Sequence, residues 1–388
     1  MAFAAALSQH PLATHAVGEV VGQILDQMGD APDAAIVFVT PPFAGALEDI
    51  AAAVRATLRP GALIGATAAA VLAGDQEVEQ GAAISLFAMR FGTQSRHSPT
   101  RIARALPIDV VRHEDAWRVS ADVDLALPGA TVVLVADPFS FPVDAFVDDV
   151  TSRAPGLTVV GGLASAGSGP GGNRLVADGR TTSQGAVALL LPPGIGAHAV
   201  VSQGCRPVGE PLVVTKATGN VIEEIAGQPA LDRLMAQAEA ATPEDRSRMA
   251  RGLQLGLVLD EHKLEFESGD FLIRAVLGAD HERRAVAVGA EIEVGSTVQF
   301  QVRDAVTADE DLRDLLADQP GAAALVFTCT GRGTNLFPAP DHDARIVNEH
   351  VEGGATAGMF SGAEIGPVGE RHFVHAMSAT VLLFDDDR

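Results

Sequence analysis

The stretch ALVFTCT, residues 324–330, is a short apolar run that ends in Thr-Cys-Thr. Two other runs have the same β-rich character, AIVFVT at 35–40 and TVVLVAD at 131–137. Runs of this length and composition are typical of buried strands. Each is followed by a segment with helical periodicity and then by a second apolar run that contains glycine. The sequence therefore predicts alternating strands and helices, as in an α/β fold.

The order strand, helix, strand, strand occurs three times. The predicted helices cover Ala44–Leu58, Val143–Ser152 and Asp341–Val351. From the middle of the first strand to Gly65, Gly161 or Gly358 of the second, the separations are 28, 28 and 32 residues. This spacing indicates a duplicated βαββ unit, and the alternative is a coincidence among generic α/β segments.

The sequence between the second and third units does not repeat this order of elements. It predicts an antiparallel meander with strands at Leu253–Asp260, Phe271–Leu277, Arg284–Val288 and Ser296–Val302. A helix is expected to open at Gln228-Pro229, and a second at Thr307-Ala308-Asp309-Glu310, which has the form of a capping box.

We therefore expect a mixed α/β fold of two lobes built from βαββ units, with the meander inserted in the second lobe. The predicted division is an N-terminal segment 1–30, a first lobe 31–200 and a second lobe 201–388. The boundary is expected near Gly194–Cys205, where proline and glycine cluster.

Composition and charge narrow the possible functions. With 388 residues, 47% hydrophobic and 20% charged, the chain is typical of a globular protein of more than one domain. It contains no tyrosine, so no tyrosine can act as an acid, a nucleophile or a base-stacking platform. The net charge of −23 disfavours nucleic acid and membrane surfaces as partners.

The expected location is cytoplasmic. Residues 1–12 lack the positively charged leader of a secretory signal. The longest uncharged stretch, Thr181–Cys205, is broken by Pro192-Pro193-Gly194 into pieces too short to span a bilayer. Cys205 and Cys329, the two cysteines, are then expected to be reduced.

The turn after the third apolar run is the richest candidate site. Thr328-Cys329-Thr330-Gly331-Arg332-Gly333 follows a strand end, where backbone N–H groups can hold an anion. Glu364 follows the neighbouring predicted strand, so Arg332 and Glu364 are expected to face one crevice. Such a pair suits the carboxylate and the ammonium of a zwitterion. The alternative is an ordinary Arg–Glu ion pair between two loops.

Two further segments are candidate linings of the same crevice, Gln203-Gly204-Cys205-Arg206 and Val214-Thr215-Lys216. Because nearby positive charge lowers the pKa of a thiol, Cys205 and Cys329 are candidate reactive thiols. The alternative is that each is a small buried hydrophobe. A hydrolase that pairs Cys329 with His375 stays open as well, since catalytic partners can be distant in sequence.

Signals for metals and cofactors are weak. Asp341-His342-Asp343, His350, His372 and His375 can be drawn together as a metal site, but no HExxH or paired-cysteine spacing is present. Residues 167–172 match the dinucleotide fingerprint literally, but Pro occupies the fourth position and no helix is predicted to follow. We expect neither a metal nor another cofactor.

Several motifs together resemble the FIST family, the sensory module named after F-box and intracellular signal transduction proteins. The likeness covers about Ala35 to Phe384. The segments that carry it are GALIGATAAAVLAGDQEVEQGAAISLF (61–87), VVGGLASAG (159–167), VSQGCRPVGEPLVVTKATGNVIEEIAGQPAL (201–231), FLIRAVLGAD (271–280), TCTGRGTNLF (328–337) and AEIGPVGERHFVHAMSATVLLF (363–384).

The resemblance implies an intracellular small-ligand sensor, with amino acids as the ligands proposed for the family. Ser361 stands where a second cysteine often occurs, and Thr330 stands where the family's CNGRG motif has Asn. The expected ligand-binding residues are Cys329, Thr330, Gly331, Arg332, Gly333 and Glu364, with Cys205, Arg206 and Lys216 close by.

The leading hypothesis is a sensor that binds an amino acid or a related small carboxylate and signals through a separate protein. One alternative is an enzyme that acts on a small metabolite with Cys329 as its nucleophile. Another is a protein-interaction scaffold without a small ligand. The sequence favours a binding protein over an enzyme, and it does not indicate the ligand, the oligomeric state or the partner.

Overall fold

The structure is a computed structural model of the chain, and it describes residues 1–91, 102–113, 116–120, 127–263, 265–266, 269–319 and 321–385. These residues form two compact units. The first unit comprises Met1–Val201, Arg313–Val374 and Ser378–Arg388, and the second comprises Ser202–Leu312 and His375–Met377. The predicted lobes are continuous segments of sequence, whereas the chain returns to the first unit after completing the second.

Helices of both units are few and short. Their bounds are α1 Ala13–Met28, α2 Leu47–Leu58, α3 Val143–Arg153, α4 Ala230–Ala240, α5 Pro243–Arg251, α6 Ala305–Ala317 and α7 His342–Glu349, with 3₁₀ turns at Pro41–Ala46 and Gly333–Asn335. No helix among the residues described has the length and apolar character needed to cross a membrane.

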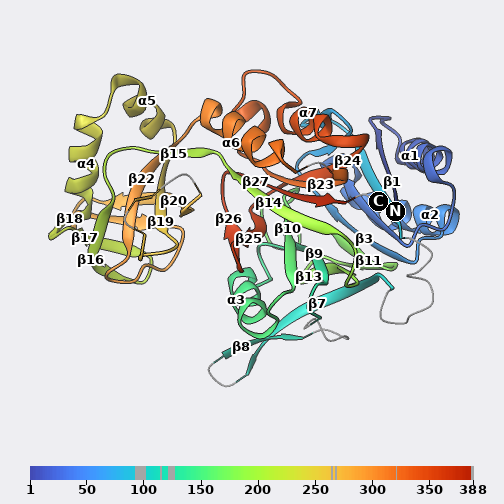
Figure 1. Cartoon of the computed structure of the whole chain (residues 1–388), viewed down its shortest axis with the longest axis horizontal. Coiled ribbons are helices and arrows are strands. Elements are labelled where there is room, and N and C mark those ends of the chain that lie inside the picture. The colour runs from blue at the N-terminus through green and yellow to red at the C-terminus, as the bar shows by residue number, and fades with distance from the viewer. Residues whose placement is uncertain are drawn as a thin grey trace. The chain divides into compact units, whose positions relative to one another are not determined.

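The first unit contains three mixed sheets (Figure 1). The first sheet has the order β1 (Ala2–Ser8), β6 (Ile84–Arg90), β2 (Ala34–Val39), β3 (Ala62–Thr67), β11 (Leu175–Ala177) and β12 (Arg180–Thr182). The second has the order β26 (Arg371–His375), β25 (Glu364–Val368), β10 (Thr158–Leu163), β9 (Thr131–Ala136), β13 (Ala186–Leu191), β7 (Arg104–His113) and β8 (Ala116–Ser120). The third has the order β14 (Ala197–Gln203), β27 (Ser378–Phe384), β23 (Gly321–Cys329), β24 (Val351–Ser361), β4 (Val71–Ala73) and β5 (Gln76–Val78).

Each sheet contains a parallel pair of strands joined through a helix, with an antiparallel strand on the other side of the first. These triplets are β6-β2-β3, β13-β9-β10 and β27-β23-β24. The predicted mixed α/β class is thereby confirmed, and the predicted strands and helices of the three segments lie within a few residues of those observed. Duplication of a βαββ unit stays a prediction.

The three sheets exchange hairpins. Hairpin β4–β5 lies in sequence between strands of the first sheet but pairs with β24 of the third. Hairpin β11–β12 leaves the second sheet and pairs with β3 of the first, while β25, next to β26, leaves the third and pairs with β10 of the second. Each sheet is therefore completed by a segment that belongs in sequence to another.

The main core of this unit lies where the three sheets meet. Residues of one face of β2, β9 and β23 share a single cluster: Ile36, Phe38, Val133, Val135, Leu325 and Phe327. The ring of Phe38 meets that of Phe327 edge to face, with centroids 6.0 Å apart. Successive side chains of a strand point to opposite faces of the sheet. The apolar side chains on the other face of each sheet must therefore be buried by other elements.

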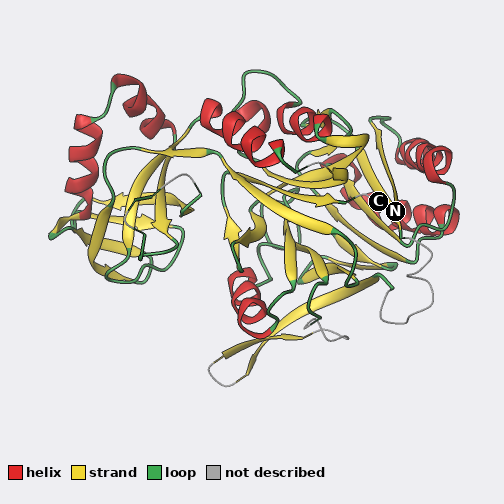
Figure 2. Cartoon of the chain, viewed as in Figure 1, coloured by secondary structure: helices red, strands yellow, loops and turns green. Residues whose placement is uncertain are grey.

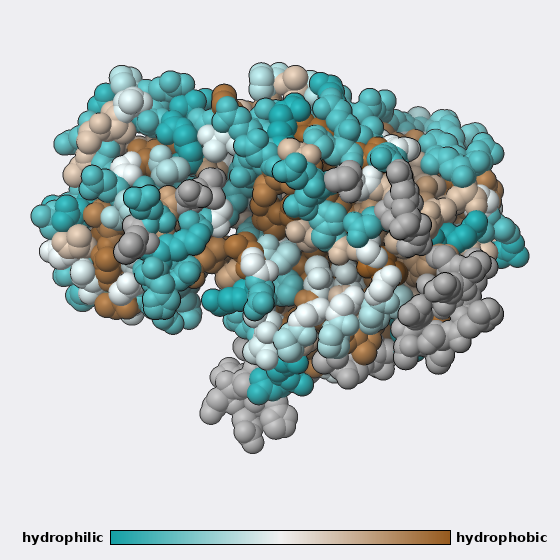
Figure 3. All heavy atoms as spheres, in the orientation of Figure 1, coloured by the Kyte–Doolittle hydropathy of each residue, from teal (hydrophilic) through white to brown (hydrophobic). Residues whose placement is uncertain are grey.

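Amphipathic helices cover those faces. Helix α1 buries Ala16, Val20 and Ile24 together with Val37 and Val39 of β2, and α3 buries Phe146 and Val150 against the second sheet. Figure 2 shows α1, α2, α3 and α7 at the periphery with the strands between them, and the face of α1 seen in Figure 3 is mainly hydrophilic. Coverage on both faces explains why every residue of β2 is buried.

The second unit is one antiparallel sheet. Its order is β15 (Cys205–Pro207), β22 (Thr297–Arg303), β16 (Leu212–Thr218), β17 (Val221–Ile225), β21 (Ala285–Val288), β20 (Phe271–Asp280) and β19 (Leu253–Val258), with β18 (Gln228–Pro229) on β17. Pairing of β19 with β22 closes this path around an apolar interior that includes Val214, Leu255 and Phe300. The predicted meander strands are confirmed.

Two sequence predictions of helix starts need correction. Helix α6 begins at Ala305, so Thr307 is inside it, and Asp304 Oδ1 accepts the hydrogen bonds of the Val306 and Thr307 N–H groups. Asp304 therefore takes the capping role that the Thr307 pattern suggested. Pro229 precedes the first residue of α4 instead of lying in its first turn.

The N-terminal segment is also more integrated than its separate assignment suggested. Strand β1 pairs with β6 along its whole length, from Ala2 opposite Arg90 to Ser8 opposite Ile84. Helix α1 then packs on the same sheet as α2. Residues 1–28 are therefore part of the first unit's structure.

Glycine is required where the parallel strands approach most closely. A Cβ placed on Gly358 would lie 2.0 Å from the carbonyl oxygen of Val326, its partner on β23. On Gly161 it would lie 1.9 Å from that of Leu134, its partner on β9. Neither backbone oxygen can move without separating the strands.

We therefore expect Gly358→Ala to lower the free energy of unfolding by about 3 kcal/mol or more, as overpacking of a rigid core does. The matched control is Gly18→Ala in α1, where nothing lies within 4 Å of the added Cβ. That change is expected to raise stability by up to about 1 kcal/mol through helix propensity. Urea denaturation of both variants measures the difference, and equal stabilities would contradict the close approach.

Candidate functional site

The candidate site begins where β23 ends. Thr328 and Cys329 close the strand, and register pairs Cys329 with Ser361 at the end of β24. The Thr330 N–H donates to the Ser361 carbonyl at 2.9 Å, which holds the two strand ends together as the chain turns. The backbone then enters the 3₁₀ turn Gly333–Asn335.

Arg332 is the largest fully buried side chain in this turn, with no exposed surface. Its guanidinium makes a two-pronged ion pair with Asp343, Nε to Oδ2 at 2.7 Å and Nη2 to Oδ1 at 2.8 Å. The ring of Phe337 lies below it, 5.2 Å from Cζ. Charge and planar geometry therefore position Arg332 against the first turn of α7.

Asp343 collects further donors. The Thr328 hydroxyl donates to Oδ2 at 2.6 Å, and His342 Nδ1 lies 2.9 Å from Oδ1. Burial alone would raise the pKa of Asp343, but the charge and hydrogen bonds of Arg332 outweigh it and hold that pKa below its usual value. The pair is therefore fully ionised across the physiological pH range.

This geometry differs from the expected arrangement of Arg332 and Glu364. The donor fork of Arg332 is occupied by Asp343, and Nη1 is the guanidinium nitrogen that has no partner among the described residues. Glu364 lies at the start of β25, opposite Gly162 of β10, and its Oε2 accepts from the Ser378 N–H at 3.3 Å and hydroxyl at 2.7 Å. Arg332 still acts on Glu364 through its charge.

Several buried polar atoms of this region, Glu77 Oε2 among them, make no hydrogen bond to any residue that the structure describes. Three others are Arg332 Nη1, Ser361 Oγ and Glu364 Oε1, and we call these three residues the buried polar cluster. A Cβ on Gly162 would meet Ser361 Oγ at 2.1 Å, which shows that the Ser361 hydroxyl points at the residue opposite Glu364. Buried polar atoms of native proteins nearly always have a partner, so this concentration makes the buried polar cluster the candidate binding position.

Burial dominates the titration of Glu364. It raises the pKa of this carboxyl to about 8, although the hydrogen bonds of Ser378 and the charge of Arg332 act in the opposite direction. The carboxyl therefore carries its proton in most molecules at pH 7.

A second buried carboxyl, Glu77 of β5, lies against the same ion pair. Its Oε1 accepts the Ala344 N–H at 3.0 Å, and its pKa is raised to about 8 by burial and by the charges of Asp343, Glu79 and Asp341. No sequence pattern pointed to Glu77, because this residue reaches the ion pair only through the exchanged hairpin β4–β5.

The predicted glycines and cysteine shape the turn. The Gly331 N–H donates to Cys329 Sγ at 3.4 Å, and Cys329 is buried. Gly333 has φ of 54°, and a Cβ there would lie 2.8 Å from both Glu79 and Phe360. These residues therefore set the backbone path around Arg332, and whether they contact a ligand stays a prediction.

The remaining predicted site residues belong to the second unit. Cys205 is buried with Phe271 and Ile273. Lys216 is exposed on β16, with Nζ 2.6 Å from Glu223 Oε2. Their role at the same site as Arg332 stays a prediction.

Arg206 of the second unit pairs with Asp245 and Asp304. Although burial acts to lower it, hydrogen bonds to these two carboxylates raise the pKa of Arg206. Its charge is therefore already matched by neighbouring carboxylates within the second unit.

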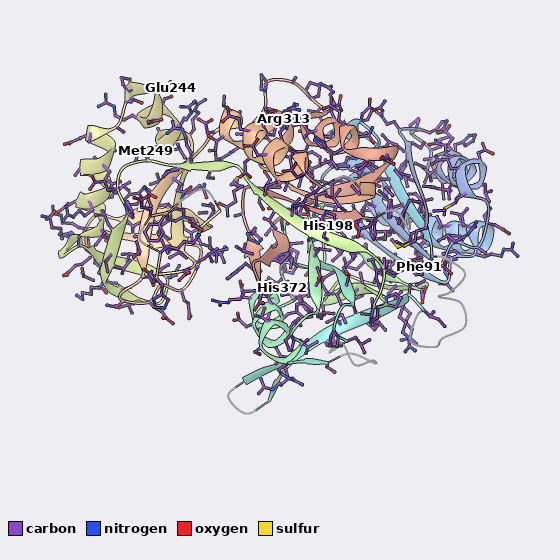
Figure 4. All side chains as sticks on the ribbon, in the orientation of Figure 1. Phe91, His198, Glu244, Met249, Arg313 and His372 are labelled. Carbon is purple, nitrogen blue, oxygen red and sulfur yellow. The ribbon has the colours of Figure 1, made fainter. Side chains whose placement is uncertain are left out.

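The histidines considered as metal ligands occupy separate places. His342 stacks on Phe337, His350 Nδ1 lies 2.8 Å from the Ile346 carbonyl, and His372, labelled in Figure 4, accepts the Val159 N–H on Nε2 at 3.0 Å. Within the described ranges, no group of three His, Cys, Asp or Glu side chains has a geometry that could hold a metal ion. His375 belongs to the second unit, and its pairing with Cys329 stays a prediction.

Comparison with known proteins gives a consistent result. The FIST N domain matches residues 33–228 and the FIST C domain matches residues 230–367. An uncharacterized protein of Mycobacterium tuberculosis is 38% identical over 389 residues, which cover 98% of each chain. An uncharacterized protein of Mycobacterium bovis is 37% identical over 384 residues, which cover 97% of each chain.

The ion pair predicts a large stability effect. Asp343→Asn keeps the shape of the side chain but leaves the Arg332 charge buried without a counter-charge, so it should lower the free energy of unfolding by about 3–5 kcal/mol. The control is Arg345→Ala, which removes an exposed partner of Asp341 at 3.9 Å and should cost less than about 1 kcal/mol. Denaturant unfolding measures both, and similar losses would contradict the assigned role of Asp343.

Glu77 predicts a pH dependence. The pKa of Glu77 is about 8 in the folded state and 4.5 ordinarily. Between pH 4.5 and pH 8 the folded state therefore binds more protons than the unfolded state. Its contribution to stability is therefore present below pH 4.5 and lost as pH rises to 8. Relative to wild type, Glu77→Gln should gain a few kcal/mol between pH 5 and pH 8. Glu48→Gln, on the exposed face of α2, is the control, and a difference that does not change with pH would count against this assignment.

Proposed function

This chain belongs to the FIST family, and from that membership we propose that it is a sensor whose ligand is a small carboxylate, an amino acid or a related acid, bound at the buried polar cluster. FIST domains are signal-transduction sensor domains. The proposal adds a site and a ligand class to that general role. It also includes a separate protein as the partner that carries the signal onward.

One observation carries the proposal. Arg332 is completely buried, two of its nitrogens are held by Asp343, and Nη1 has no acceptor among the described residues. Leaving a charged donor unpaired inside a protein costs far more than leaving a neutral one. An acceptor with negative charge, such as a carboxylate, removes that cost.

The neighbours of Nη1 support a polar ligand. Ser361 supplies a hydroxyl that can donate or accept, and Glu364 supplies Oε1. Ser361 ends β24 and Glu364 begins β25, so strand pairing fixes these two members, while the ion pair with Asp343 holds Arg332 in the turn after β23. Sites built on strands hold their geometry better than sites on loops.

The cysteine-dependent alternative has less support from the structure. Cys329 is 2% exposed, and its Sγ accepts a backbone hydrogen bond from Gly331. A nucleophile has to reach its substrate, so a thiol in this position favours a structural role in the turn.

Calorimetry with small organic acids and amino acids tests the proposal. At least one acid should bind wild-type protein, and Ser361→Ala should weaken that binding about tenfold by removing one hydrogen bond to a charged group. Ser168→Ala, in an exposed loop, is the matched control and should leave the affinity unchanged. Absence of binding by every acid, or equal affinities of Ser361→Ala and wild type, would overturn the proposal.

A further inference from the structure

We propose that the buried polar cluster binds the ligand's carboxylate with three donors, Arg332 Nη1–H, Ser361 Oγ–H and the protonated Oε1–H of Glu364, and that it prefers acids without an ammonium group to the corresponding amino acids. This inference rests on the proposed function and narrows its ligand class.

The hydrogen bonds of Glu364 place the proton on Oε1. Both donors of Ser378, its N–H and its hydroxyl, go to Oε2, so that oxygen is the acceptor of the carboxyl group. Oε1 receives no donor from the described residues. An ionised carboxylate here would keep one oxygen buried without a hydrogen bond, whereas a neutral acid presents Oε1–H as a donor.

The charge balance agrees with a neutral Glu364. The positive charge of Arg332 is matched by Asp343, which lies within hydrogen-bonding distance of two of its nitrogens. With Glu364 protonated, the three groups sum to zero, so the single negative charge of a bound carboxylate is not opposed by a further negative charge on Glu364. A bound carboxylate then brings one negative charge to three donors, an arrangement that stabilises carboxylates in proteins.

Few ionisable groups from the packed elements can alter this balance. Strands β10 and β27 carry none, β23 contributes Cys329, and β26 contributes Arg371, His372 and His375. The His372 ring is neutral at Nε2, which accepts a hydrogen bond, and burial lowers its pKa. The charge of Arg332 favours ionisation of Glu364 but is outweighed by burial.

The pKa of Glu364 sets the expected loss of affinity for an amino acid. An ammonium group needs the ionised form of Glu364, and with a pKa of about 8 only about one tenth of the molecules have it at pH 7. Binding an ammonium would therefore cost about a factor of ten in affinity before any other loss. In the neutral form of Glu364, the Oε1–H donor faces the N–H donors of the ammonium group, so no hydrogen bond can form between them.

The experiment uses the full chain and matched acids that differ only in the amino group: propanoate and alanine, butanedioate and aspartate, pentanedioate and glutamate. Isothermal calorimetry at pH 7 should show at least one acid without an ammonium binding about tenfold or more tightly than its amino acid. Repeating the titration in two buffers of different ionisation enthalpy should show almost no proton release, because Glu364 stays protonated.

Variants at position 364 test whether Glu364 acts as a hydrogen-bond donor or as a negative charge. Glu364→Leu should lower the affinity for the preferred acid tenfold or more. Glu364→Gln should recover most of it, since the amide places its carbonyl towards Ser378 and its NH₂ where Oε1–H was. Circular dichroism of each variant confirms that it is folded, and Ser168→Ala serves as the neutral control.

Three results would overturn the inference. If an amino acid binds as tightly as its deaminated partner or releases about one proton, the cluster holds a zwitterion, and the proposed function survives alone. If Glu364→Gln binds no better than Glu364→Leu, the carboxylate form of Glu364 is the one that binds. If no acid of either kind binds wild-type protein, the proposed function fails with the inference.

Discussion

The constraint on which the turn after β23 and its surroundings depend is the need to neutralise a guanidinium that has no exposed surface. Arg332 lies between the end of β23 and the start of α7, and Asp343 neutralises its charge through two hydrogen bonds. The Asp343 carboxylate also accepts the hydrogen bond of the Thr328 hydroxyl, and its charge raises the pKa of Glu77. One ion pair therefore holds a turn against a helix, and its carboxylate adds to the effect of burial in raising the pKa of a neighbouring carboxyl.

Hairpin exchange brings the other carboxyls to this place. Glu77 is in β5, which leaves the first sheet's segment of sequence to join the third sheet, and Glu364 is in β25, which leaves the third to join the second. The three sheets share one apolar core, and the second and third sheets also carry the buried carboxyls Glu364 and Glu77. The close approach of Gly162 and Ser361 is possible because the residue opposite Glu364 has no side chain.

Local signals in the sequence were sufficient for much of the fold. Apolar runs and helical periodicity predicted β2, β9, β23 and most helices, because these elements bury a face at regular spacing. The start of α6 differs from the prediction because Thr307 and Asp304 both suit a cap, and only the structure shows that the Asp304 carboxylate accepts the N–H groups. Strand β1, AFAAALS, was missed because alanine carries little strand signal.

Long-range contacts were beyond such reasoning. Arg332 and Glu364 could be singled out by charge beside glycine, but the partner of Arg332 could not, because Asp343 also fitted a helix start. Glu77 and Ser361 acquire their importance only through strand pairing across the sheets. Burial also changes the chemistry of these side chains, because it raises the pKa of Glu77 and Glu364 and leaves Arg332 dependent on Asp343 for its counter-charge.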